Sequence, residues 1–240
     1  MKKRNIGIVG NGPTDRSFFG KVAECIISKS GSDNTSFNII PLNRHNLHDD
    51  VDRYWEEADK TNEHYLPSKP ALKLQAAVTG MLTAAFSDFE SEIGIGSLSC
   101  HDVLLVTTDT EKTLSTPETY FKTWAFSFSK ILMGAIQTFY SMMAKNRYYP
   151  EYLPLIISVA TFPSTEILVG AARGQHNECY GKTPKELKRR LYATEDILSE
   201  EQFKEKALDR ITAESIDLIF RHVPESRIFI QTLLALGRSN

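Results

Sequence analysis

The chain has 240 residues, of which 41% are hydrophobic and 24% charged, so it is long enough and apolar enough to bury a core. Its formal net charge of −2 excludes a protein that coats nucleic acid over its whole surface, and any such contact must come from a local basic patch. No stretch approaches the ~20 consecutive apolar residues of a membrane span. The three cysteines lack the paired spacing of zinc sites and favour a reducing compartment. We therefore expect a cytoplasmic protein without membrane contact.

The first predicted unit is a strand, a glycine turn and a helix, over residues 6–19. A short apolar run reads as a buried strand, and residues 10–13 (Gly-Asn-Gly-Pro) form a tight turn. A helix then opens at Thr14 and Asp15, with apolar residues at the spacing of one helix face. Phosphate or metal chemistry is often built at such a turn.

The glycine turn allows more than one function. A dinucleotide site would need glycine or alanine where Asp15 stands, and that carboxylate would repel a pyrophosphate. A nucleotide-binding α/β domain that uses Gly10 and Gly12 for a phosphate is one alternative. A βα turn with no ligand is another.

The remaining elements follow in a β-α-β-αα-β-α-β-α order, which predicts an α/β sheet with helices on both faces. After the first unit we expect a strand at 36–42, helices at 46–63 and 72–89, a strand at 102–107, a long helix at 117–146 and a strand at 153–161. This organisation predicts an α/β domain over 1–175 with a helical insertion at about 46–93. Residues 176–240 are expected to form a helical extension packed on it.

An aromatic stripe runs along the long predicted helix. Phe121, Trp124, Phe128 and Phe139 recur at three-and-four spacing, together with aliphatic residues. Such a stripe is more often core than a stacking platform for bases, so we predict that it is buried.

Acidic residues follow three of the predicted strands. Asp15 comes after the first, Asp109 and Glu111 after the third, and Glu166 after the fourth. Because the carboxyl ends of parallel strands face one edge, these side chains could converge there. Hard oxygen ligands of this kind suit Mg²⁺ or Mn²⁺. The alternative is that each acid is a helix N-terminal or turn residue.

A basic stretch follows between residues 173 and 192. It could hold a nucleic-acid backbone beside the acids, or it could form a solvated helix face. The residues we single out for the first role are Lys182, Lys185, Lys188 and Arg189.

Several of these motifs, taken in order, resemble those of TOPRIM-fold proteins, especially the bacterial OLD-type and RloB-like nucleases. The turn at 10–15 resembles the family's strand–EG–P–T–D/E turn, and Asp109-Thr110-Glu111 resembles its D-x-D. Residues 162–169 are similar to a proline turn followed by a glutamate and an apolar helix. Residues 182–188 resemble a lysine–proline segment. The family's fold implies a TOPRIM-like, mostly parallel sheet of about four strands flanked by helices.

The resemblance implies a metal-dependent nuclease that cleaves DNA or RNA. In it, Asp109 and Glu111 would hold the metal, Asp15 would bind it directly or lie behind it, and Glu166 would complete the acidic pocket. Asn11 stands where the family has its catalytic glutamate, and an amide is a weaker ligand and no useful base. A catalytically impaired relative that binds protein or nucleic acid is therefore an alternative.

The resemblance also bears on partners. Related nucleases often serve bacterial anti-phage defence beside an ATPase, so an ATPase partner and a nucleic-acid substrate are implied. A homo-oligomer is compatible with this reading, and the sequence itself does not specify one.

Overall fold

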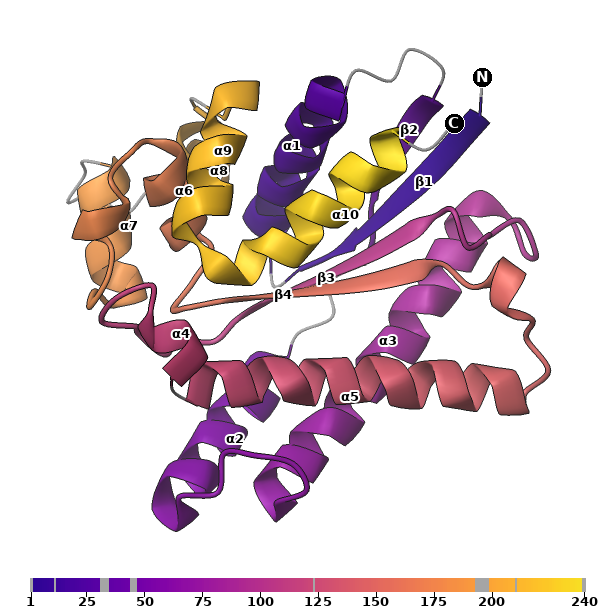
Figure 1. Ribbon diagram of the computed structural model, residues 1–240, viewed down its shortest axis with the longest axis horizontal. Helices are drawn as coiled ribbons and strands as arrows, with labels where there is room; N and C mark the ends of the chain where they lie inside the picture. The colour runs from indigo at the N-terminus through magenta and orange to yellow at the C-terminus, as the bar shows by residue number, and fades with distance from the viewer. Residues whose placement is uncertain are drawn as a thin grey trace.

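The computed structural model describes residues 2–10, 12–30, 35–43, 47–122, 124–192, 199–209 and 211–238. At its centre lies a sheet of four strands, all parallel, in the order β2-β1-β3-β4 (Figure 1). The strands are β1 (Lys2–Val9), β2 (Thr35–Pro41), β3 (Val103–Asp109) and β4 (Leu155–Thr161). Their order confirms the predicted α/β class with a parallel sheet flanked by helices.

The helices connect and cover these strands. They are α1 (Pro13–Ser30), α2 (His48–Thr61), α3 (Lys69–Ile93), α4 (Thr119–Lys122), α5 (Trp124–Lys145), α6 (Glu166–Ala172), α7 (Pro184–Tyr192), α8 (Glu200–Leu208), α9 (Ala213–His222) and α10 (Arg227–Arg238). Three short 3-10 helices, η1 (Pro150–Tyr152), η2 (His176–Glu178) and η3 (Pro224–Ser226), complete the described elements. None of the described helices combines the length and apolar character that crossing a membrane requires.

Successive residues of the central strand enter different hydrophobic clusters because side chains alternate across a sheet. Leu104 and Val106 pack among the residues of α2, α3 and α5, whereas Val103 and Leu105 pack among those of α1 and α6–α10. Both faces of the sheet are therefore covered, as Figure 1 shows. This burial on both sides explains why β3 begins with a continuous apolar run, Val103–Val106.

The helices of the C-terminal extension build much of the second layer. Helices α8, α9 and α10 all contact α1, and Arg4 of β1 donates a hydrogen bond to the Leu236 carbonyl over 2.7 Å. Phe229 of α10 packs edge-on against Phe19 of α1, with ring centroids 5.9 Å apart. Residues 176–238 thus share one core with α1, as far as they are described.

The structure departs from the long helix predicted at 117–146 in two respects, the continuity of the helix and the burial of its aromatic residues. It is replaced by α4 and α5, which lie on either side of residue 123, itself outside the described part of the chain. The predicted burial of the aromatic stripe holds for Phe128 and Phe139, whereas Phe121 was placed wrongly, because 54% of its surface is exposed. Phe121 belongs to α4, so the periodicity of α5 does not carry it into the core.

Gly7 of β1 provides a test of how tightly α3 packs on the sheet. A Cβ atom at Gly7 would lie 2.8 Å from the ring of Phe89, which is fully buried. Gly7→Ala should therefore cost about 1–3 kcal/mol, the usual effect of overpacking. Gly80→Ala, on the exposed face of α3 with no atom within 4 Å, should stabilise the protein by about 0.5–1 kcal/mol. Urea unfolding measures both, and equal effects of the two substitutions would contradict this packing.

Candidate functional site: an acidic cluster at the carboxyl edge of the sheet

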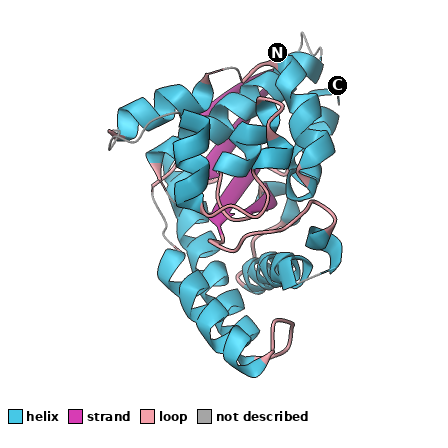
Figure 2. Cartoon of the chain, turned by 90° about the vertical axis from the view of Figure 1, so that its left-hand side faces the viewer, coloured by secondary structure: helices cyan, strands magenta, loops and turns pink. Residues whose placement is uncertain are grey.

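The sheet has a topological switch point between β1 and β3. The chain leaves β1 for β2 on one side and returns to β3 on the other, so the connections diverge beyond the carboxyl ends of β1 and β3. Ligands of open α/β sheets bind at such points. Figure 2 looks onto the side of the molecule at which β3 and β4 end, with α5 seen end-on.

Gly10 lets the chain turn closely at this point. The Thr107 hydroxyl donates a hydrogen bond to the Val9 carbonyl over 3.1 Å, which joins the ends of β3 and β1. A Cβ atom at position 10 would lie 2.9 Å from that hydroxyl oxygen and 3.2 Å from the Cβ of Asp15. Glycine is thus required by close approach, independently of any phosphate.

Asp109, the last residue of β3, is held by the turn that follows β4. Its Oδ1 accepts hydrogen bonds from the Thr161 hydroxyl (2.6 Å), the Thr165 N–H (3.0 Å) and the Thr165 hydroxyl (3.1 Å). Burial, followed by the negative charges of Asp15 and Glu166, nevertheless raises the pKa of Asp109 well above its usual value. The carboxylate is therefore rigidly positioned but not electrostatically neutralised.

Asp15 reaches the same place from the first turn of α1. Burial raises its pKa to about 6, and the charge of Glu166 adds to this, while a hydrogen bond from the Thr165 side chain and the charge of Lys188 oppose it. Thr165 therefore contacts both Asp15 and Asp109. The two aspartates lie close enough for the charge of Asp15 to raise the pKa of Asp109.

Glu166 opens α6 and brings a third carboxylate to this edge. Its Oε2 accepts a hydrogen bond from the Ser164 hydroxyl (2.6 Å), and its Oε1 accepts a long one from the Tyr192 hydroxyl (3.5 Å). Lys188 of α7 places its Nζ 3.9 Å from the same Oε1. We call Asp15, Asp109 and Glu166 the acidic cluster.

Glu111 lies at the border of the acidic cluster. Its N–H bonds the Pro163 carbonyl over 2.8 Å, and its backbone is left-handed, with φ of 58°. Burial raises its pKa, whereas the charges of His48 and Lys188 lower it, so it faces α2 as well as the cluster. A non-glycine residue in this conformation is strained, and such strain is common at functional sites.

Trp55 fixes this loop from the opposite side. Its indole N–H donates to the Thr110 carbonyl over 2.9 Å, while the Thr110 N–H bonds the Thr161 and Pro163 carbonyls, both over 3.0 Å. The loop that carries Asp109 and Glu111 is thus held between α2 and the end of β4.

The predicted site residues divide into three groups. The structure gathers Asp15, Asp109 and Glu166, and it sets Glu111 at their border. Asn11 lies outside the described residues. Of the basic residues predicted to hold nucleic acid, Lys185, Lys188 and Arg189 are exposed on α7, and Lys182 is partly exposed just before it. Lys188 also reaches Glu166 with its Nζ.

Sequence reasoning missed the groups that hold the carboxylates. These are the hydroxyls of Thr161, Ser164, Thr165 and Tyr192. Three of them fall within residues 161–165, at the end of β4 and in the turn that follows, so the hydroxyl-rich run beside Glu166 is a signal that could have been used. Tyr192 had no such signal, because it is distant in the chain and arrives with α7.

The chemistry of the acidic cluster fits a hard divalent cation. It offers oxygen donors only, and burial, with neighbouring negative charge as a smaller cause, raises the pKa values of Asp15 and Asp109, so a cation there would stabilise their charged forms. Within the described residues, however, no three or more His, Cys, Asp or Glu side chains are already arranged around a common metal position. The residues thus supply suitable ligands without a preformed cage.

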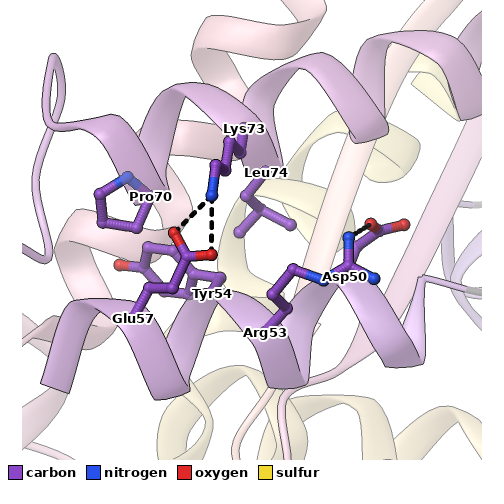
Figure 3. A pocket seen from close by; sticks show the side chains of 7 residues that line it. All are labelled: Asp50, Arg53, Tyr54, Glu57, Pro70, Lys73 and Leu74. Carbon is purple, nitrogen blue, oxygen red and sulfur yellow. Dashed lines mark hydrogen bonds and ion pairs between the residues drawn. The ribbon is translucent and has the colours of Figure 1, made fainter. Parts of the chain in front are cut away.

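A notch between α2 and α3 is a poorer candidate. Figure 3 shows that its charged side chains already pair, with Lys73 bonded to Glu57 at 2.7 Å and Arg53 to Asp50 at 3.4 Å. Its volume of about 20 Å³ admits little more than a water molecule. It is better explained as a packing gap between two paired helices.

A further buried carboxylate, Glu225 of η3, lies apart from the acidic cluster. Burial raises its pKa to about 8, and its charge acts on Tyr120 and Tyr180 rather than on the cluster. Among the described residues no side chain bonds its carboxylate, and the backbone N–H groups of Glu225 and Phe162 oppose the rise in its pKa. It is therefore a useful internal control for experiments on the cluster.

Comparisons with protein-family models, with curated proteins and with solved structures found no match. The fold and site therefore define the protein only as an α/β protein with a four-stranded parallel sheet and an acidic cluster at its switch point.

The electrostatics of Asp109 can be tested by pH-dependent stability. Because its pKa is higher in the folded than in the unfolded state, the folded state binds more protons, and stability falls as pH rises above the ordinary aspartate pKa. Asp109→Asn removes the part of this loss of stability that comes from ionisation of Asp109. It should raise the melting temperature at pH 7–8 by an amount that shrinks towards pH 4.

Asp102→Asn is the matched control. Asp102 is also buried, but its carboxylate accepts backbone N–H bonds from Asn5 (2.7 Å) and Ser99 (2.8 Å). Replacing it should cost about 1–3 kcal/mol at neutral pH. Calorimetry across pH 4–8 compares the variants, and a destabilised Asp109→Asn protein at pH 8 would contradict the repulsion inferred for the acidic cluster.

Proposed function

We propose that this chain is a TOPRIM-like protein that acts on phosphodiester bonds of DNA or RNA with the help of Mg²⁺ or Mn²⁺. The observation that carries the proposal is the meeting of Asp15, Asp109 and Glu166 beyond the carboxyl edge of the sheet. These acids are separated by dozens of residues in the chain, yet the Thr165 side chain bonds both Asp15 and Asp109. Burial, followed by the charges of Asp15 and Glu166, raises the pKa of Asp109. Buried repulsion of this kind is costly and concentrates at functional sites.

The chain's own groups have distinct roles in this proposal. Asp15 and Asp109 hold the cation, while Glu166 and Glu111 complete its acidic surroundings. A bound divalent metal polarises the phosphate and lowers the pKa of a water molecule. Thr161 and Thr165 fix the Asp109 carboxylate, so its reorganisation on cation binding is small.

Asn11 makes a binding role the second candidate. Its amide cannot act as a base near neutral pH. Lys188 already provides a positive charge 3.9 Å from Glu166, which favours a cluster that is stable without metal. In this alternative the protein is a TOPRIM-like subunit that binds nucleic acid or another protein without cleaving a substrate.

The biological setting forms part of the same proposal and rests on the resemblance alone. It assigns the protein to a bacterial anti-phage defence system in the cytoplasm, as an effector that works with an ATPase partner.

Cation binding is tested by thermal shift. Mn²⁺ at 100 times its dissociation constant should stabilise the protein by about 2.7 kcal/mol, a rise of about 5–10 °C in melting temperature. Asp109→Asn should remove this response, whereas Glu225→Gln, a buried carboxylate outside the acidic cluster, should keep it. A response that is unchanged in Asp109→Asn would contradict the assignment of the cation to this site.

Cleavage is tested with plasmid DNA and with RNA in the presence of Mn²⁺. We expect Asn11→Glu to gain phosphodiesterase activity over the parent chain, because it restores a carboxylate at the turn. Asn11→Gln is the control of matched size. If Asn11→Glu binds Mn²⁺ but cleaves neither substrate, the nuclease proposal fails and the binding role is favoured.

A further inference from the structure

Two exposed aromatic rings lie where the long predicted helix is interrupted. Phe121 of α4 has 54% of its surface exposed, and Phe126 in the first turn of α5 has 39%. Their ring centroids are 6.2 Å apart, with an interplanar angle of 53°. We call this pair the aromatic shelf. Large apolar rings that adjoin one another in solvent indicate a binding surface more than isolated exposed residues do.

Ring contacts connect the aromatic shelf to the acidic cluster. Tyr120 lies beneath it, 5.0 Å from Phe121 and 6.0 Å from the fully buried Phe162, centroid to centroid. Phe162 directly precedes Pro163, whose carbonyl accepts the Glu111 N–H. The shelf is thus fixed two ring contacts away from the turn that holds Asp109. In Figure 1, α4 and the start of α5 lie at the end of the molecule where β3 and β4 finish.

Two lysines lie beside the aromatic shelf, with the exposed Glu118 close enough for Lys122 to lower its pKa after hydrogen bonds from Thr116 and its own backbone. Lys130 places its Nζ 4.7 Å from the centroid of Phe126, and Lys122 is exposed beside Phe121 in the chain. The Gly181 N–H bonds the Leu114 carbonyl over 2.8 Å, so the middle of the basic stretch, just before Lys182, lies against the loop that leads to α4. The elements that carry these basic residues, α4, the start of α5 and α7, lie at the end of the molecule where β3 and β4 finish (Figure 1).

Exposed aromatic rings beside basic side chains favour binding of single-stranded nucleic acid over a duplex. Proteins that bind single strands stack unpaired bases on aromatic side chains and hold the neighbouring phosphates with basic residues. Bases within a duplex are already stacked on both faces, so they offer no face to a side chain unless they are flipped out. Because Lys130 covers a face of Phe126, Phe121 is the ring with the more accessible face.

We propose that Phe121 stacks an unpaired base of a single-stranded nucleic acid, with adjacent phosphates on Lys122 and Lys130. This inference rests on the proposed action on nucleic acid and narrows its substrate to single-stranded or locally unpaired chains. The acidic cluster and the shelf then contact the same strand. The shelf positions the strand through a base, and the acidic cluster lies at its phosphodiester backbone.

The test measures binding separately from cleavage. Fluorescein-labelled 15-nucleotide single strands of DNA and RNA, and a 15-base-pair duplex, are titrated by anisotropy, once with Ca²⁺ and once with EDTA. Phe121→Leu should weaken single-strand binding about 5- to 150-fold, which corresponds to the loss of one base–aromatic stack. Phe121→Trp should retain the affinity. Tyr149→Leu, which removes a 65% exposed ring at the opposite end of α5, should leave it unchanged.

The binding measurements support or overturn base stacking on Phe121. The proposal is overturned if the parent chain binds no single strand, if the duplex binds as tightly, or if Phe121→Leu and Tyr149→Leu have equal affinity. It is also overturned if Phe121→Leu changes only the mass measured by light scattering, which would make the shelf an interface between copies of this chain. Single-strand binding that depends on Phe121, together with an Asn11→Glu variant that binds Mn²⁺ but cleaves neither substrate, supports the shelf and defeats the nuclease proposal. Cleavage that is unaffected by Phe121→Leu supports the nuclease proposal and defeats the role of the shelf.

Discussion

The hydrogen bonds between the end of β3 and the turn after β4 position everything at the carboxyl edge. One oxygen of Asp109 accepts from Thr161 and twice from Thr165, while the Pro163 carbonyl accepts the N–H groups of Thr110 and Glu111. These contacts join two segments that are more than fifty residues apart in the chain. Because the same turn leads into α6, the geometry of Asp109 and that of Glu166 are set together.

The acidic cluster places several carboxylates together in a buried setting, which is electrostatically costly. Burial and mutual repulsion raise the pKa values of Asp15 and Asp109, and Lys188 offsets part of this cost from α7. A sequence selected only for stability would place neutral side chains here. The unrelieved repulsion is consistent with a site whose purpose is to bind something positively charged.

The helical extension contributes to this edge as well as to the core. Its apolar residues close the α1 face of the sheet, and this packing brings Lys188 and Tyr192 of α7 to Glu166. On the other face, Trp55 of α2 bonds the Thr110 carbonyl between the two acids of β3's loop. Both helical layers therefore hold the loops of the sheet in place.

The sequence by itself determined the class of fold and the place where acids would gather. Periodicity distinguishes strands from helices, the apolar run of β3 requires burial on both faces, and parallel strands must end at one edge, so Asp15, Asp109 and Glu166 could be selected before any coordinates. Only the tertiary structure decided which of these acids meet. It set Glu111 at the border through a left-handed backbone, brought the exposed Lys188 within reach of Glu166 and left Phe121 exposed. Such outcomes depend on hydrogen bonds and packing between distant segments, which local spacing in a sequence does not encode.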